Sequence, residues 1–350
     1  MRLLPLAAGG ASVLMAALAI AQIVESPGRI DDVPEPSSLP SAGMGTVEIS
    51  IAAGAAPGEI GQQLEDAGVI DSTTQFSVLV ALLGYEGSLQ AGDYEFTANT
   101  AELDAVYRIR RGIVTTRSVT VIEGWRLEEI ADAVAEQGIP REEFIAQAHV
   151  RNFDLEFLSG QRGGAALEGY LYPATYSIRR DDTVDDVLAR MLEAFQEALP
   201  ADAGQQAAQA GFTLHEVVTI ASIIEREARV EEERPIMAQV FLRRLRQGIP
   251  LEADPTVQYA LAQAPQSVEQ FGWWKRELTL ADLEVDSPYN TYANDGIPPG
   301  PICSPRADSV IAVLEPADTN YLYFVARPDG SHAFAETFEE HQQNIDLYQQ

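Results

Sequence analysis

Apolar and polar residues recur with regular periods over most of the chain, which predicts a folded protein of strands and helices. Residues 47–51 alternate as a half-buried strand does, and helical spacing follows until Gly68. A similar pattern returns at residues 118–140. A shift of 70 residues matches Ile60 with Ile130, Leu64 with Val134, Gly68 with Gly138 and Val69 with Ile139. The chain is therefore predicted to contain an internal repeat of a strand–helix–helix unit within an α+β fold.

A long apolar helix is predicted over residues 213–228, TLHEVVTIASIIEREA. Its first four residues, Thr213 to Glu216, form a capping box, which places the start of the helix. On a helical wheel Glu225 lies inside the arc of apolar side chains. Arg226 and Glu227 point away from that arc, toward the expected solvent side. The wheel thus predicts one carboxylate on a buried face.

A carboxylate in that position has two interpretations. Burial raises the pKa of a carboxyl group, and a carboxyl that stays protonated near neutral pH is what a general acid requires. Alternatively, an arginine neutralises the carboxylate of Glu225 at the end of a core helix. Taken alone, the helix favours the second interpretation.

The amino-terminal segment predicts export of the chain. Residues 3–24 carry no charge, and a stretch of that length can span a bilayer. The alternative is a cleaved signal peptide, because Ala19-Ile20-Ala21 resembles a cleavage site. The apolar run continues beyond that site, which favours an uncleaved anchor over residues 1–24 with Arg2 on the cytoplasmic side. A buried core helix is disfavoured, since a Pro-, Ser- and Asp/Glu-rich stretch follows.

The length of 350 residues suggests two or three structural units. Residues 25–45 have the composition of an extended linker. We expect a small strand–helix–helix–strand module over residues 46–118 and a larger mixed α/β domain over residues 119–350.

Charge and composition exclude several classes of function. Acidic residues outnumber basic ones by 53 to 23, so the chain should not bind nucleic acid through phosphates. A pyridoxal-phosphate lyase needs a Schiff-base lysine, and Lys275 is the sole lysine. His215-Glu216 opens like a zinc-protease motif, but Thr219 stands where its second histidine belongs. Cys303 is the single cysteine, which excludes an internal disulfide. We expect neither a metal nor another cofactor.

Unusual residues concentrate in the larger domain. The segment LEGYLYPATY holds Glu168, a second candidate acid, and two tyrosines that share one face if the segment is extended. Residues 287–305 gather five prolines and two tyrosines around Asn290, and Asp329-Gly330 is predicted to be a hairpin turn. Each motif also has a structural interpretation: tyrosines in a core, prolines in a turn, and Asp254-Pro255 at the start of a helix.

Five segments taken together resemble the bacterial endolytic murein transglycosylases of the YceG-like family. They are EGYLYPATY, IASIIEREA, LEADPTVQYAL, SPYNTYANDGIPPGPI and YLYFVARPDGSHAFAETFEEH, in the order of the family. The resemblance covers nearly the whole chain after the linker and implies a membrane anchor, a LysM-like module and a catalytic domain. The chain departs from the usual pattern at Ala174, at Arg243 and at Ser304-Pro305-Arg306, where NPG is usual.

The resemblance implies that the catalytic residue is the first acid of ASIIEREA, Glu225, which reverses the preference drawn from the helix alone. The tyrosines would stack on sugar rings and Asn290 would bind acetamido groups. The residues expected to bind substrate are Glu168, Tyr170, Tyr172, Asp254, Tyr289, Asn290 and Tyr292.

The implied reaction cleaves the β-1,4 bond between N-acetylmuramic acid and N-acetylglucosamine within nascent peptidoglycan strands and leaves 1,6-anhydro ends. It would terminate glycan elongation at the inner membrane, with the catalytic domain on the periplasmic side and cell-wall synthases as possible partners. The alternative is a membrane-anchored scaffold that binds peptidoglycan without cleaving it.

Overall fold

The computed structural model describes residues 46–112, 117–158, 165–179 and 182–349. The predicted anchor and linker lie outside these residues. The chain divides into two compact units, residues 1–114 and 115–350, which are described separately. The predicted border had given Arg117 and Ser118 to the small module, but both belong to a strand of the second unit.

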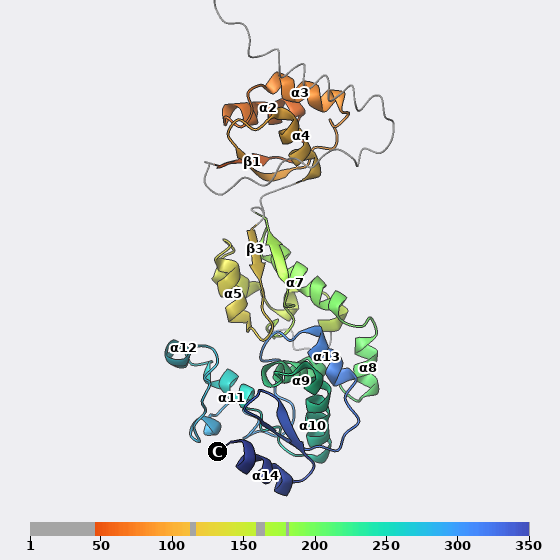
Figure 1. Ribbon diagram of the computed structural model, residues 1–350, viewed down its shortest axis with the longest axis vertical. Helices are drawn as coiled ribbons and strands as arrows, with labels where there is room; N and C mark the ends of the chain where they lie inside the picture. Colours follow the sequence, from red (N-terminus) through yellow and green to blue (C-terminus); the bar gives the residue numbers. More distant parts are fainter. Residues whose placement is uncertain (1–45, 113–116, 159–164, 180–181, 350) are drawn as a thin grey trace, which may run out of the picture. The chain divides into compact units, whose positions relative to one another are not determined.

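Over residues 46–112, the first unit is a two-stranded sheet with three helices (Figure 1). Strand β1 (Thr46–Ile51) pairs antiparallel with β2 (Gly92–Thr97). Helices α2 (Pro57–Asp66) and α3 (Thr73–Leu82) connect the strands, and α4 (Glu102–Arg111) follows them. The alternating strands turn one face inward, so that the core contains Ile49, Ile60, Leu64, Phe76, Tyr94, Phe96 and Ile109. The strand–helix–helix–strand order is the predicted one, and its likeness to a LysM module stays a prediction.

The second unit begins with the same order of elements. Strand β3 (Arg117–Thr120) pairs antiparallel with β4 (Thr175–Ile178), and α5 (Leu127–Ala135) and α6 (Arg141–Gln147) lie between them in sequence. Two short 3₁₀ turns, Val150–Asn152 and Glu156–Leu158, precede β4. Helix α7 (Val184–Ala198) follows β4 as α4 follows β2. The two halves of the predicted repeat therefore share one order and one strand pairing.

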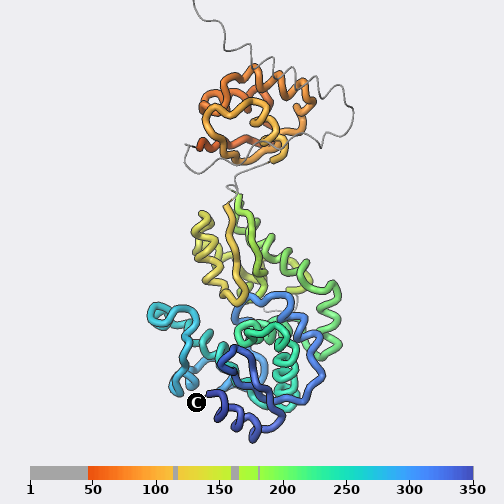
Figure 2. Tube along the Cα trace, viewed as in Figure 1, coloured from red at the N-terminus to blue at the C-terminus, as the bar shows by residue number. Residues whose placement is uncertain are grey.

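The rest of the second unit is mainly helical. Its helices are α8 (Ala203–Gln209), α9 (Leu214–Glu227), α10 (Arg234–Gln247), α11 (Asp254–Leu261), α12 (Pro265–Phe271), α13 (Ala307–Leu314) and α14 (Phe338–Tyr348). Short 3₁₀ turns occur at Glu231–Glu233 and Asp282–Glu284. Strands β5 (Tyr323–Ala326) and β6 (His332–Ala335) form a hairpin, as predicted. The Cα trace shows the segment through α12 reaching out at the side of this helical part (Figure 2).

Helix α9 is the central helix of this helical part of the second unit. The backbone N–H of Thr213 donates to Glu216 Oε2 at 2.7 Å and the N–H of Glu216 donates to Thr213 Oγ1 at 3.2 Å, which confirms the predicted capping box. Every residue from Val217 to Ile224 is buried, because α8, α10, α11 and α13 surround the helix. Because neighbours surround the helix, it has no single polar face, and acidic residues in its last turn pack against other helices.

Three two-stranded sheets and a larger number of helices make the described fold mixed α and β, in agreement with the predicted α+β class. Within the described ranges no single helix is long and apolar enough to cross a membrane. Helices α8 and α9 pass that test only as a pair, and they meet at 93°.

Candidate active site

Two glutamates, Glu225 and Glu227, occupy the last turn of α9. Side chains two positions apart on a helix point in directions that differ by about 200°. The two carboxylates therefore face different neighbours, and the helix ends directly after them because Ala228 adopts an extended conformation.

The Glu225 side chain is only 3% exposed and is held by α13. Its Oε2 accepts hydrogen bonds from the backbone N–H of Arg306 at 3.0 Å and from Ser309 Oγ at 2.7 Å. Its Oε1 accepts from Arg306 Nε at 3.0 Å. Arg306 also donates to Glu123 Oε1, at 2.5 Å. Both oxygens of Glu225 are thus occupied by protein donors, as in the ion-paired interpretation of this position.

Glu227 has a different environment. Burial raises the pKa of its carboxyl to about 8, the negative charge of Asp254 adds to this effect, and Arg226 opposes it. Among the described residues, no hydrogen bond or ion pair to its carboxylate is formed. The side chain is partly buried, so the predicted solvent-facing position of Glu227 was wrong. The wheel missed this because it assumed one buried face, whereas α11 packs against the opposite side of α9.

Asp254 begins α11 beside Glu227, and a third residue completes this group. Asp254 Oδ1 accepts a hydrogen bond from the hydroxyl of Tyr292 at 2.6 Å. Burial, together with this bond to Asp254, raises the pKa of the Tyr292 phenol, which therefore remains a donor. The loop that carries Tyr292 is fixed to α11 by Thr291 Oγ1, which lies 2.9 Å from Thr256 Oγ1. We call Glu227, Asp254 and Tyr292 the acid cluster.

Glu168 is buried in the second unit, where the elements from β3 to α7 meet the helices that follow them. Its Oε1 accepts from the backbone N–H of Leu127 at 3.0 Å, and its Oε2 accepts from the Tyr259 hydroxyl at 3.3 Å. Burial raises its pKa to about 8, the charge of Glu128 adds to this, and Arg126 opposes it. With 7% of its surface exposed, Glu168 links α5 to α11 and has little contact with solvent.

The predicted sugar-stacking tyrosines occupy different positions. Tyr170 is fully buried, its ring packed against Phe157 and Phe195, so its assignment as a sugar platform was wrong. Tyr172 is partly buried against the same core. Tyr289 is also partly buried, with its ring centroid 4.7 Å from that of Tyr259. The tyrosine-in-core interpretation therefore holds for Tyr170.

Asn290 supports the loop rather than a ligand. It is fully buried, and its Nδ2 donates to the carbonyls of Leu283 at 2.8 Å and Val285 at 2.9 Å. Its Oδ1 accepts from the backbone N–H of Tyr292 at 3.0 Å. All of its polar atoms are engaged, so the predicted bond to acetamido groups is wrong. Asn290 instead positions Tyr292 in the acid cluster.

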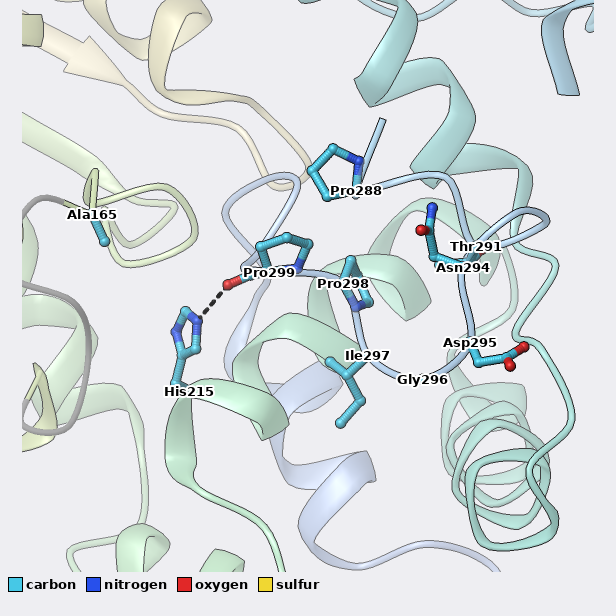
Figure 3. A pocket seen from close by; sticks show the side chains of 10 residues that line it. All are labelled: Ala165, His215, Pro288, Thr291, Asn294, Asp295, Gly296, Ile297, Pro298 and Pro299. Atoms are coloured by element: carbon cyan, nitrogen blue, oxygen red, sulfur yellow. Dashed lines mark hydrogen bonds between the residues drawn. The ribbon is translucent and has the colours of Figure 1, made fainter. Parts of the chain in front are cut away.

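A cavity of about 460 Å³ opens beside the first turn of α9. Figure 3 shows His215 between Ala165 on one side and the proline-rich loop on the other. The ring nitrogens of His215 lie 2.9 Å from the Tyr170 hydroxyl and 3.1 Å from the Pro299 carbonyl. The sequence singled out His215 only for a failed zinc motif, and no local signal pointed to this cavity.

Two observations concern metal binding and the family of the chain. In the described part of the chain, no group of three or more His, Cys, Asp or Glu side chains could hold a metal ion. The model of the YceG-like family matches residues 49–347.

Known proteins resemble the chain over most of its length. An endolytic murein transglycosylase of Bacillus subtilis (strain 168) is 33% identical over 321 residues, which cover 87% of this chain and 85% of that protein. An endolytic murein transglycosylase of Streptococcus pneumoniae (strain D39) is 30% identical, over 85% of this chain and 58% of its own length. A crystal structure of a yceG-like protein from Listeria monocytogenes matches with a TM-score of 0.55 and 31% identity, over 85% of this chain and 98% of that one.

Proposed function

The chain belongs to the YceG-like family, and we propose that it cleaves peptidoglycan strands internally as a murein lytic transglycosylase. The bond broken is the β-1,4 bond between N-acetylmuramic acid and N-acetylglucosamine. The product on the muramic acid side is a 1,6-anhydro end, formed without water.

The observation that carries the mechanism is the acid cluster. A carboxyl with a pKa of about 8 is largely protonated at neutral pH, as a proton donor must be. No hydrogen bond or ion pair to the Glu227 carboxyl is formed among the described residues, so its proton is available to a ligand. Glu225 lacks this freedom because Arg306 and Ser309 engage both of its oxygens. We therefore assign the general acid to Glu227 and not to Glu225.

The reaction needs only one such residue. Glu227 donates its proton to the glycosidic oxygen while the bond from that oxygen to C1 of muramic acid breaks. The C6 hydroxyl oxygen of the same sugar then bonds to C1, and its proton passes to the Glu227 carboxylate. Glu227 ends protonated, and the substrate supplies the nucleophile that a second carboxylate provides in ordinary retaining glycosidases.

Glu225 has a structural role in this mechanism. Its carboxylate accepts from the backbone N–H of Arg306, the residue that caps α13, and from Ser309 in the first turn of that helix. A carboxylate at a helix amino terminus is stabilised by the free N–H groups and the helix dipole. Glu225 thereby fixes the end of α9, which carries Glu227, against α13.

The biological setting is also a proposal. The uncharged residues 3–24 support a single-pass anchor in the inner membrane with residues 46–350 in the periplasm. There the enzyme would meet nascent strands, end their elongation and encounter the synthases that make them. Recovery of the intact amino terminus from the inner-membrane fraction is expected, whereas a mature chain starting at Gln22 would indicate a cleaved signal peptide.

Digestion of purified sacculi tests the activity. The released fragments should carry 1,6-anhydro-muramyl ends, which mass spectrometry separates from hydrolysed ends by the mass of one water molecule. Ends that contain the added water would indicate a hydrolase. Binding to sacculi without released fragments would indicate the scaffold.

A further inference from the structure

A second cavity, of about 690 Å³, has no role in the mechanism above. It is bounded by the end of α9, by α11 and by the segment around and after α12. Its lining is Glu129, Arg226, Arg229, Gln258, Phe271, Trp273, Trp274 and Arg276. We call it the arginine pocket.

The pocket is basic in a chain whose net charge is −30. The Arg226 guanidinium carbon lies 3.9 Å from the centre of the Trp274 ring. Its Nη1 donates to the Gly124 carbonyl at 3.4 Å, whereas its buried Nε has no hydrogen-bond partner in the described part of the chain. The pocket's one acid, Glu129, is already engaged, since it accepts from Trp274 Nε1 at 3.2 Å and from the backbone N–H of Arg126 at 3.0 Å. These two donors are uncharged, so the lining holds three arginine charges against one carboxylate charge and is positive on balance.

A fourth arginine lies beneath the tryptophans. Arg126 is fully buried, with its guanidinium carbon 4.2 Å from the Tyr259 ring and 4.9 Å from the Trp273 ring. Its Nε pairs with Glu128 at 3.3 Å, and both of its terminal nitrogens lack a hydrogen-bond partner among the described residues. The buried Arg126 guanidinium therefore adds to the positive potential around the Trp273 and Trp274 rings.

The pocket and the acid cluster draw residues from the same two helices. Arg226 immediately precedes Glu227 on α9, and Gln258 follows Asp254 by one turn of α11. Binding of one substrate at both places requires that a group attached to the sugar beside the cleaved bond extends from the acid cluster to the arginines. In peptidoglycan, that sugar is muramic acid, whose lactyl group carries a peptide with free carboxylates.

We propose that the arginine pocket binds the carboxylates of the peptide attached to muramic acid, an inference that rests on the proposed function. Guanidinium groups bind carboxylates through paired hydrogen bonds, and the tryptophan rings suit the aliphatic parts of a peptide. The pocket thus selects strands that still carry their peptides over bare glycan.

Binding can be measured without turnover in the full-length chain carrying Glu227→Gln. Calorimetry would compare a disaccharide–peptide fragment of peptidoglycan with the same fragment after its carboxylates are amidated. Charge-assisted hydrogen bonds predict that amidation weakens binding roughly tenfold. Arg229→Gln with Arg276→Gln should weaken binding of the acidic fragment by a similar factor and leave the amidated fragment unaffected.

The matched control is Arg246→Gln, an exposed arginine at the end of α10, which should change neither affinity. Equal affinity for the acidic and amidated fragments would overturn the proposal, as would unchanged binding in the double variant. Inorganic pyrophosphate serves as the competitor for a lipid-linked strand end. Displacement of the fragment by pyrophosphate at lower concentrations than by the free acidic peptide would assign the pocket to that end instead and also overturn the proposal.

Failure of this inference is distinct from failure of the proposed function. Anhydro ends released from sacculi, with no effect of amidation on binding, would leave the transglycosylase intact and remove only the peptide site. Tighter binding of the acidic than of the amidated fragment, with no release of anhydro ends, would support the peptide site and reject the transglycosylase activity.

Discussion

The two sides of the last turn of α9 place the same residue type in opposite environments. On one side, Glu225 accepts three hydrogen bonds at the start of α13. On the other side, Glu227 faces the acidic residue that begins α11, and burial with that charge raises its pKa. The comparison teaches that the neighbours, and not the helix itself, decide which carboxylate can exchange a proton.

The largest expected effect distinguishes the two acids directly. Glu227→Gln preserves shape but removes the exchangeable proton, so release of anhydro fragments from sacculi should fall about 10²- to 10⁴-fold. Thermal denaturation and circular dichroism should show an intact fold. Glu231→Gln, an exposed acid four residues on, is the control and should keep normal release. Near-normal turnover in Glu227→Gln, with complete loss in Glu225→Gln, would reverse our assignment.

Glu168 extends the comparison to stability, because it is an acid with a raised pKa and little exposure. A carboxyl whose folded pKa exceeds its unfolded pKa stabilises the fold at low pH and loses that contribution as pH rises through the folded value. Between pH 6 and 9, the free energy of unfolding of the native chain should fall, by an amount on the order of 1 kcal/mol per group.

The control for this pH dependence is Glu168→Gln, which cannot ionise and still accepts a bond from Leu127 N–H. Urea denaturation should show a smaller loss of stability between pH 6 and 9 in Glu168→Gln than in the native chain. An identical pH dependence in both proteins would exclude Glu168 as its source.

Glu225 should matter more for stability than for chemistry. Glu225→Ala leaves the start of α13 without its acceptor, and the loss of these hydrogen bonds should cost about 1–3 kcal/mol of unfolding free energy. Glu123→Ala also removes a partner of Arg306, but an exposed ion pair contributes about 0–1 kcal/mol. Chemical denaturation of both variants tests the difference. A smaller loss in Glu225→Ala than in Glu123→Ala would contradict the structural role.

The smallest effect concerns the charge beside Glu227. Asp254→Asn removes a negative charge that raises the pKa of Glu227, so that pKa should fall. Turnover needs the protonated acid, and its alkaline decline should begin near pH 8 in the native enzyme. In Asp254→Asn the decline should move to lower pH by less than about one unit. A shift to higher pH would show that Asp254 acts in some other way.

Local patterns predicted the fold well because they depend on neighbouring residues. The capping box at Thr213 and Glu216, the alternation of β1 and the hairpin turn at Asp329-Gly330 involve contacts within a few positions. The wheel also placed Glu225 correctly on a buried face.

The acid cluster could not be predicted from such patterns. Glu225 meets Arg306 across 81 positions, and α11 covers the side of α9 that the wheel left to solvent. Asn290 looked like a ligand for sugars because its polarity is visible in the sequence, whereas the two backbone carbonyls that it binds are not. Long-range packing decides these roles.

The repeated order of β1 to α4 and β3 to α7 allows the two copies to be compared position by position. They differ in the turn between the first strand and the first helix. In one copy that turn is made of small residues, Ala52 to Ala56. In the other copy it carries Glu123, which reaches Arg306, and Arg126, which lies beneath the tryptophans. In the second copy, this single turn therefore supplies both a salt bridge to the residue that caps α13 and a cation beside the aromatic rings.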